Sequence, residues 1–193
     1  QLYIGKLLTD YQVEIVKTIP TDIDNKQIIL LIPLLKETKM DLILQKSAEL
    51  GVSKIIPVEL ERSIIKLDSL KAEKRLIRWQ KILKEASEQS KRIDIPVITP
   101  IKKLTSLTNL DGLKIVCSTN ERQNTLKKVL KNNKGYDKII VLIGPEGGLT
   151  DNEESNLVSN GFVKVTLGKL IMRVETVPLF VLSILNYESM VVK

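Results

Sequence analysis

A stretch in the C-terminal third of the chain, IIVLIGPEGGLTDNEE (residues 139–154), restricts the possible folds more than any other part of the sequence. It opens with five consecutive apolar residues and continues with three glycines within the next five positions. Thr150, with Glu153 three residues later, matches the capping box that begins a helix. A short apolar run bounded by glycines is typical of a buried strand, so the stretch predicts a strand, a tight turn and a helix in an α/β protein.

The glycine turn of this stretch is a candidate ligand site. Glycines permit positive φ and let the backbone approach a ligand without an intervening Cβ. Free N–H groups at the start of the following helix would point back toward the turn, which can bind an anion or a polar ligand edge. Glycine turns after strands also serve as plain connections, so the turn alone does not establish a site.

A second segment follows the same pattern. Residues 162–167 predict another strand, Gly168 ends it, and the polar residues Arg173, Glu175 and Thr176 precede an apolar helix predicted over residues 177–190. The carboxyl ends of parallel strands meet at one edge of a sheet, so two glycine turns that follow strands predict one pocket there. The helix is apolar nearly all round, which means that it is buried within the domain or packed against a second subunit.

The rest of the chain predicts strands and helices in alternation. Strands are expected at residues 28–35, 55–58, 97–99 and 113–118, and helices at residues 39–50, 70–90 and 121–130, with a short helical stretch at 101–107. This alternation is typical of a mainly parallel α/β sheet with helices on both faces. Residues 2–4 and 11–19 predict strands of a small β unit. We therefore expect two domains, residues 1–27 and residues 28–193.

Composition excludes several classes of chemistry. The chain has no histidine and one cysteine, Cys117, which excludes Ser-His-Asp and Cys-His catalysis and the usual zinc sites. No metal is therefore expected. A lone cysteine also excludes a disulfide framework and fits a reducing compartment, so we expect a cytoplasmic protein. No stretch is long and apolar enough to predict a membrane span.

The net charge of +7 favours a polyanionic partner if the basic residues cluster. Between residues 62 and 92 the basic residues outnumber the acidic ones: Arg62, Lys66, Lys71, Lys74, Arg75, Arg78, Lys81, Lys84, Lys91 and Arg92. Trp79 is the one aromatic residue of this region, so phosphate contacts on folded RNA fit better than stacking on single-stranded bases. A solvated helix face would explain the same charges.

Four segments in order carry a family resemblance. IGPEGGLTDNE (143–153) followed by LGKLIMRVET (167–176), together with LILQKSAELGVSKIIPVELERS (42–63) and RWQKILKEASEQSKR (78–92), resembles the RsmE family of the SPOUT methyltransferase superfamily. The resemblance implies methylation of N3 of a uridine in 16S ribosomal RNA of the small ribosomal subunit, with S-adenosylmethionine as donor. It also implies a homodimer, a trefoil-knotted sheet and a preceding PUA-like β-barrel, of which residues 1–27 would be a remnant.

The resemblance extends to individual site residues. It implies that backbone and side-chain groups at three strand ends hold the donor, namely Ser118, Thr119, Ile143, Gly144, Gly148, Leu167, Gly168, Ile171, Met172 and Thr176. RNA contacts are expected at Arg62, Gln89 and Arg92. The chain departs from the family pattern at Leu170, where the family commonly has a second basic residue.

The expected reaction assigns catalytic roles to Arg173 and Glu175. Uracil N3 becomes nucleophilic once its proton is lost, and charge then develops on O2 and O4, where a fixed cation such as Arg173 would stabilise the transition state. A structural ion pair with Glu175 would also explain Arg173. Glu146 or Glu175 could accept the proton, although Glu175 could instead cap the last helix.

Other functions remain open at this point. A methyltransferase of the same superfamily could act on a ribose 2′-hydroxyl, and sequence chemistry does not distinguish that target from uridine N3. A non-catalytic RNA-binding protein would explain the charge but not the two glycine turns. A different α/β enzyme with a nucleotide or phosphate ligand would explain the first glycine turn but not residues 167–176.

Overall fold

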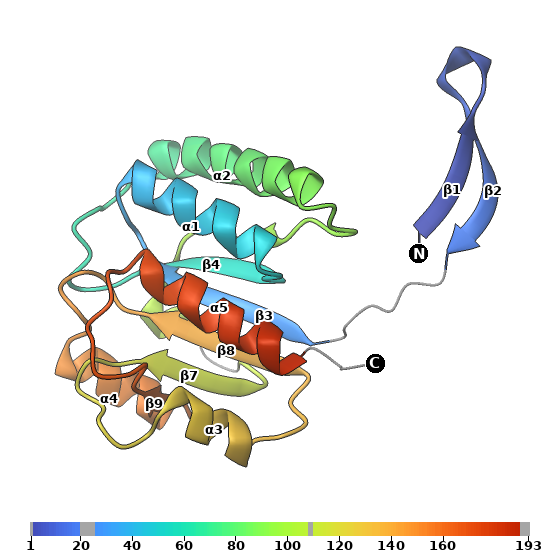
Figure 1. The fold of residues 1–193 in the computed structure, drawn as a ribbon. Helices are drawn as coiled ribbons and strands as arrows, with labels where there is room; N and C mark the ends of the chain where they lie inside the picture. Colours follow the sequence, from blue (N-terminus) through green and yellow to red (C-terminus); the bar gives the residue numbers. More distant parts are fainter. Residues whose placement is uncertain (1, 20–25, 108–109, 190–193) are drawn as a thin grey trace.

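A parallel sheet organises most of the chain in the computed structural model, which describes residues 2–19, 26–107 and 110–189 (Figure 1). The strand order is β5-β4-β3-β8-β7-β9, with β6 beside β4, and every pair in this sheet is parallel. The strands are β3 Gln27–Pro33, β4 Lys54–Glu59, β5 Val97–Ile98, β6 Lys102–Lys103, β7 Leu113–Cys117, β8 Lys138–Ile143 and β9 Val163–Val165. The predicted parallel α/β sheet is confirmed.

The order of the strands places a crevice at the carboxyl edge of β8. The chain runs outward from β3 to β4 and β5, then resumes at β7, and β8 inserts between β3 and β7. Ligands of open parallel sheets bind outside the carboxyl ends of the strands where the strand order reverses. β3 and β8 are apolar and buried along nearly their whole length, as strands covered on both faces must be.

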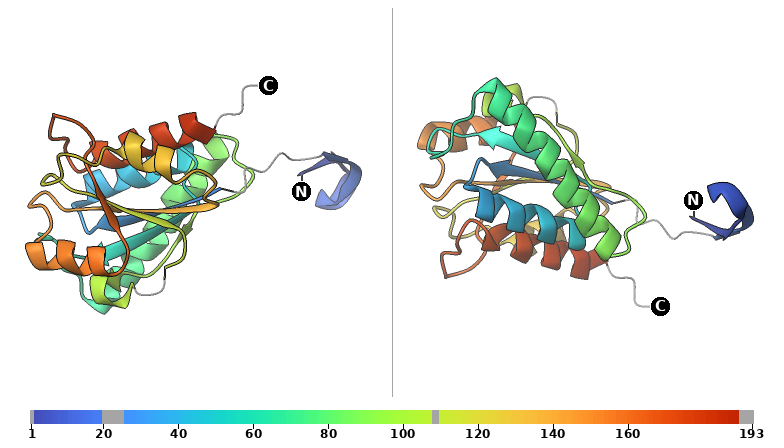
Figure 2. Two further views of the ribbon diagram at one scale, coloured as in Figure 1. Left: turned by 90° about the horizontal axis from the view of Figure 1, so that it is seen from below. Right: turned by 90° about the horizontal axis from the view of Figure 1, so that it is seen from above.

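Helices cover both faces of the sheet (Figure 2). One core lies under α1 Glu37–Glu49, α2 Ser69–Gln89, α3 Leu126–Asn132 and α5 Thr176–Ser189. The other core lies under α4 Asp151–Ser159 and the short 3-10 helix Leu104–Ser106. Both cores are built from alternate residues of the same strands, because successive side chains of a strand point to opposite faces.

Local sequence signals set the helix ends. Gly51 follows α1 with φ of 81°, in the left-handed conformation typical of a residue just beyond a helix. Asp68 caps α2 by accepting from the Lys71 N–H at 2.8 Å, and α2 buries Trp79, Leu83 and Ala86 along one face. Trp79 is therefore a core residue.

Three predicted elements differ from the structure. The helix predicted from residue 121 begins only at Leu126, because Glu121 accepts hydrogen bonds from the backbone N–H groups of Arg122, Gln123 and Asn124 and holds them in a turn. The helical stretch predicted at 101–107 consists of β6 and the 3-10 helix Leu104–Ser106. The strand predicted over 162–167 shortens to β9, and the residue at which the last helix was expected to end, Met190, lies outside the described residues.

The N-terminal segment forms a hairpin of β1 Leu2–Leu7 and β2 Val13–Ile19, joined by the 3-10 helix Thr9–Tyr11. The predicted β strands are thus present. Large apolar side chains of the hairpin are exposed, including Tyr11 at 95%. The described part of the chain contains no helix with the length and apolar character needed to cross a membrane.

Candidate active site

A cavity of about 600 Å³ lies at the carboxyl edge of β7 and β8. Its walls are residues 117–120 at the end of β7, residues 143–149 at the end of β8 and residues 166–174 after β9. The two glycine-turn segments therefore meet in one pocket, as the sequence indicated. Nine of the ten residues predicted to hold the donor line this cavity, namely Ser118, Thr119, Ile143, Gly144, Gly148, Leu167, Gly168, Ile171 and Met172.

The glycine turn after β8 is braced by Arg62. The Gly148 N–H donates to the Pro145 carbonyl at 2.8 Å, and Gly148 has φ of 71°. The Arg62 guanidinium donates to the carbonyls of Gly147 at 2.9 Å and Leu149 at 3.3 Å. A Cβ on Gly147 would lie 3.2 Å from the Arg62 Cβ, which is tighter than normal contact. Glycine is thus needed at position 147 for close packing against Arg62 and at position 148 for the backbone conformation.

The capping box begins α4 beside this turn. Thr150 accepts from the Glu153 N–H at 3.2 Å, and Glu153 accepts from the Thr150 N–H at 2.9 Å. The second carboxylate oxygen of Glu153 accepts from the Glu61 N–H at 2.8 Å. These bonds join the loop after β4 to the start of α4, so a backbone N–H and a carboxylate that are 92 residues apart in sequence hold together the two segments that carry Arg62 and Glu154.

The segment after β9 supplies backbone groups for a ligand. Within the described chain, the N–H groups of Leu167, Ile171 and Met172 make no hydrogen bond. Gly168 has φ of 132°, and no atom lies within 4 Å of the place where its Cβ would be. Unpaired amides around an open space fit a polar ligand edge, since a ligand can satisfy donors that the protein leaves free.

Lys39 is a site residue that the sequence did not single out. It extends from α1, where its Nζ donates to Glu146 Oε1 at 2.9 Å and lies 3.3 Å from Glu175 Oε2. Glu146 belongs to the first glycine turn and Glu175 to the segment before α5. The hydrogen bond with Glu146 is the main cause that raises the pKa of Lys39, so the ammonium stays charged and holds both segments. The only local sign was the position of Lys39 after a buried strand.

The two predicted catalytic residues lie just before α5. Arg173 is exposed and lines the cavity, and its carbonyl accepts from the Thr176 N–H at 2.9 Å. Glu175 has a pKa below its ordinary value, first because its own backbone N–H bonds to the carboxylate and then because Lys39 lies beside it. Thr176, the tenth predicted donor residue, is the first residue of α5 and is not part of the lining.

Side chains at the end of β7 already form hydrogen bonds within the protein. The Ser118 hydroxyl donates to Glu154 Oε1 at 2.6 Å and accepts from the Asn120 N–H at 3.1 Å. Glu154 also pairs with Lys164 at 3.2 Å. Cys117 is partly exposed as a residue, yet burial of its thiol raises the pKa to about 12, so the sulfur is not a nucleophile at neutral pH. These residues shape the floor of the cavity.

The predicted RNA residues are not all in one place. Arg62 lines the cavity, whereas Gln89 ends α2 and Arg92 follows it at the amino edge of the sheet. The Arg92 guanidinium donates to the Ala48 carbonyl at 2.7 Å and pairs with Asp94 at 2.9 Å. Several other basic residues of the 62–92 region are also paired with carboxylates, namely Lys71, Arg75, Arg78, Lys81 and Lys84.

Comparison with known proteins gives consistent matches. The RNA methyltransferase domain family matches residues 23–186. Ribosomal RNA small subunit methyltransferase E of Bacillus subtilis is 34% identical over 80% of this chain and 63% of its own length. The protein of the same name from Mesomycoplasma hyopneumoniae is 31% identical over 95% of this chain and 80% of its own length.

A solved structure extends the match. Ribosomal RNA small subunit methyltransferase E from Neisseria gonorrhoeae, bound to S-adenosyl methionine, is 35% identical, with a TM-score of 0.82 over 96% of this chain and 77% of that one. The chain therefore spans less than two thirds of the Bacillus subtilis protein and about three quarters of the Neisseria gonorrhoeae chain.

Proposed function

The chain belongs to the ribosomal RNA small subunit methyltransferase E family, and from that membership we propose that it transfers a methyl group from S-adenosylmethionine to N3 of a uridine in 16S ribosomal RNA. The observation that carries the proposal is the single cavity formed by the two glycine-turn segments. The matches to known proteins confirm the family resemblance expected from the sequence.

Donor binding rests on backbone groups. The free N–H groups at Leu167, Ile171 and Met172 would bind the polar edge of the adenine, and the turn at Gly144 and Gly148 leaves room for the ribose. Ser118 and Thr119 complete the floor, and Thr176 supports the segment through its bond to Arg173. The donor supplies a methyl group on a sulfonium, a leaving group that is already activated, so alignment provides much of the catalysis.

Arg173 and Glu175 act on the acceptor base. Arg173 is the exposed cation of the cavity nearest to the start of α5, and it stabilises the charge that develops on the uracil oxygens as N3 loses its proton. Glu175, like any carboxyl with an ordinary or lower pKa, is ionised at neutral pH and so is in the charge state that accepts a proton, and its lowered pKa makes it a weaker base than an ordinary glutamate. Lys39 keeps the carboxylates of Glu175 and Glu146 in place.

The RNA partner is small-subunit ribosomal RNA, free or in the assembled 30S subunit, and the place of action is the cytoplasm. Arg62 contacts the RNA backbone beside the cavity, and Gln89 and Arg92 contact it at the amino edge of the sheet. The basic surface of α2 supports this partner, although its paired lysines and arginines reduce the positive charge available for phosphates.

The overall architecture is proposed from the family as well. Residues 28–193 would form the methyltransferase domain, with a trefoil knot made by the segment that leads from β9 to α5, and residues 1–27 would belong to a PUA-like domain. A homodimer is supported by apolar side chains that the single chain leaves exposed near the cavity and on α5, namely Leu170, Ile171, Phe180 and Tyr187. Sedimentation velocity of the purified chain tests the dimer, and a monomer at all concentrations would contradict it.

Calorimetric titration with S-adenosylmethionine and S-adenosylhomocysteine, with ATP and NAD as controls, tests the donor site. We expect saturable binding of the first two only. A methylation assay on 16S ribosomal RNA, followed by mass spectrometry of the nucleosides, then distinguishes N3-methyluridine from a 2′-O-methyl product. Absence of donor binding by the folded protein would leave a non-catalytic RNA-binding role.

A further inference from the structure

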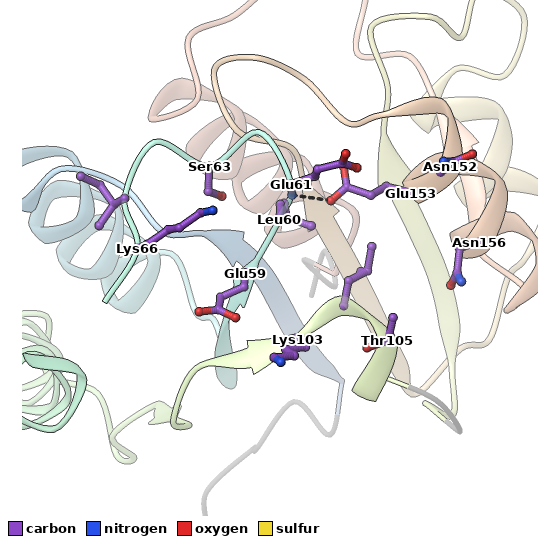
Figure 3. Close-up of a pocket in the computed structure, with 12 residues that line it drawn as sticks. Glu59, Leu60, Glu61, Ser63, Lys66, Lys103, Thr105, Asn152, Glu153 and Asn156 are labelled. Carbon is purple, nitrogen blue, oxygen red and sulfur yellow. Dashed lines mark hydrogen bonds between the residues drawn. The ribbon is translucent and has the colours of Figure 1, made fainter. Parts of the chain in front are cut away.

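A second cavity, of about 530 Å³, lies at the carboxyl ends of β4 and β6 (Figure 3). Its lining comes from the loop after β4, from the 3-10 helix Leu104–Ser106 and from α4, namely Glu59, Leu60, Glu61, Ser63, Ile65, Lys66, Lys103, Leu104, Thr105, Asn152, Glu153 and Asn156. Figure 3 shows Glu59, Ser63 and Lys66 on the side opposite Asn152 and Asn156. None of the proposed donor residues belongs to this lining.

The second cavity shares one wall with the cavity of the candidate active site, which we call the donor cavity. In the loop after β4, Arg62 lines the donor cavity while its neighbours Glu61 and Ser63 line the second cavity. At the start of α4, Glu154 lines the donor cavity and Glu153 the second. The wall is rigid, because the Glu61 N–H donates to Glu153 at 2.8 Å and the Thr150 hydroxyl donates to Glu61 at 3.0 Å. A ligand in the second cavity therefore lies beside the donor site.

Ser63 carries the evidence that the second cavity takes a ligand. Its N–H donates to the Leu60 carbonyl at 3.0 Å, which closes the turn that sets the side chain at the cavity. The residue is only 8% exposed, and its hydroxyl has no hydrogen-bond partner among the described residues. Buried hydroxyls in native proteins are almost always bonded, so a partner for this one is expected from outside the chain.

The remaining polar groups define the chemistry of that partner. In the part of the chain that the structure describes, the side chains of Glu59, Lys66, Lys103 and Asn152 make no hydrogen bond or ion pair. The carboxylates of Glu61 and Glu153 already accept hydrogen bonds within the shared wall, so Glu59 is the carboxylate that remains for a ligand. Three carboxylates against two ammonium groups disfavour a free anion, and the apolar side chains of Leu60, Ile65 and Leu104 suit a flat ring.

We propose that the second cavity binds an unstacked nucleobase with an exocyclic amino group, from a nucleotide of the RNA substrate other than the target uridine. The amino group of the base donates a hydrogen bond to Glu59. The side-chain amides of Asn152 and Asn156 supply a donor and an acceptor to the hydrogen-bonding edge of the base, and the Ser63 hydroxyl bonds to the same edge. Lys66 and Lys103 are exposed and reach the phosphate of that nucleotide. Splayed bases read on their edges are the usual mode of sequence-specific RNA recognition.

The proposal rests on RNA being the substrate, so its test is kept separate from the test of methyl transfer. The full chain, labelled with nitrogen-15 and saturated with S-adenosylmethionine, is titrated with CMP, AMP, GMP and UMP and followed by NMR. We expect saturable shifts of the amides of Leu104, Asn152 and Asn156 with at least one of the first three nucleotides. UMP should bind there at least about fivefold more weakly, because it lacks the amino group.

Two substitutions in the lining sharpen the test. Ser63→Ala should weaken nucleotide binding about fivefold without lowering the unfolding temperature, because it removes a hydroxyl that has no partner in the folded chain. Glu59→Gln should weaken the binding of the amino-bearing nucleotides but not the binding of UMP. Ser155→Ala, on the exposed side of α4, is the matched control and should change neither.

The possible failures are distinct. If S-adenosylmethionine binds in calorimetry but no nucleotide shifts the three amides, or if UMP binds there as well as every amino-bearing nucleotide, the second site is refuted and the proposed activity stands. If the donor does not bind while the amino-bearing nucleotides do, the methyltransferase activity is refuted and the base-binding site stands.

Discussion

Lys39 shows how a single residue can acquire its role only through the fold. Its ammonium lies between Glu146 and Glu175, which belong to the two segments that form the donor cavity. An ion pair on a free surface contributes little, but this one joins segments that must keep a fixed spacing around a ligand. The contribution of Lys39 should therefore be larger for ligand affinity than for stability.

Substitution of Lys39 tests this role. Lys39→Met keeps the aliphatic stem and removes the charge, so the affinity for S-adenosylmethionine should fall about threefold to tenfold in calorimetry, while Lys39→Arg should retain most of it. Lys46→Met is the matched control on α1, since Lys46 forms an ion pair with Glu49 at 2.8 Å and does not line the cavity. An equal loss in both Met variants would point to a general effect on α1.

The carboxyl of Glu175 makes stability depend on pH. A pKa below the ordinary value of 4.5 contributes stability that is present above that value and is lost as the pH falls through the folded-state pKa. Glu175→Gln should therefore unfold at a lower temperature than the wild type at neutral pH, and the difference should vanish in acid. Circular dichroism melts over this range measure it. A constant difference would exclude the ionised carboxylate as its cause.

Arg173 is the residue on which the proposed chemistry depends most. Arg173→Ala should lower the methylation rate at least about a hundredfold, because the developing charge on the uracil would lose its fixed cation. The affinity for S-adenosylmethionine should stay nearly unchanged, since the contacts proposed for the donor are made by backbone groups. Arg122→Ala, at another exposed arginine of the cavity lining, is the control. A fully active Arg173 variant would remove the assignment.

Among the elements, α4 connects helix capping to the function of both cavities. Its capping box was readable from Thr150 and Glu153, but the contact of Glu153 with the loop after β4 was not, because that contact spans 92 residues. The cap therefore stabilises a helix and also fixes the wall between the cavities.

Loss of this cap should have two effects. Thr150→Ala should lower the free energy of unfolding by about 1 kcal/mol in urea titration, as loss of a threonine cap usually does. It should also weaken donor binding, because the wall at Glu61 and Glu153 loosens. Asp68→Ala removes the cap of α2 and should affect stability without changing the donor affinity. If donor binding were equally weak in both variants, the wall would not be the cause.

At the scale of the whole molecule, the hairpin and the α/β unit differ in burial. The apolar side chains of the hairpin are exposed, whereas the sheet from β3 onward is enclosed by two cores. The α/β unit thus has the buried apolar surface that independent folding requires.

Deletion of residues 1–25 tests this division. The shortened chain should unfold cooperatively at the same temperature as the full chain in calorimetry and should bind S-adenosylmethionine with the same affinity, because the cavity draws no residue from the hairpin. Its affinity for 16S ribosomal RNA should fall if the hairpin belongs to an RNA-binding domain. A large drop in unfolding temperature would show that the hairpin supports the α/β unit.

Most of the secondary structure was readable from sequence, because apolar periodicity, capping residues and glycines act over a few neighbouring residues. The meeting of the two glycine turns was also predicted, because the carboxyl ends of parallel strands share one edge of a sheet. The late start of α3 was not, since the turn held by Glu121 competes locally with a helical pattern that looks continuous. The position of β8 between β3 and β7, the bracing of Gly147 by Arg62, the Lys39 contacts and the second cavity were decided only by the tertiary structure. Each of these depends on the lateral order of the strands, which brings together residues as far apart as Lys39 and Glu146, and no local pattern encodes that order.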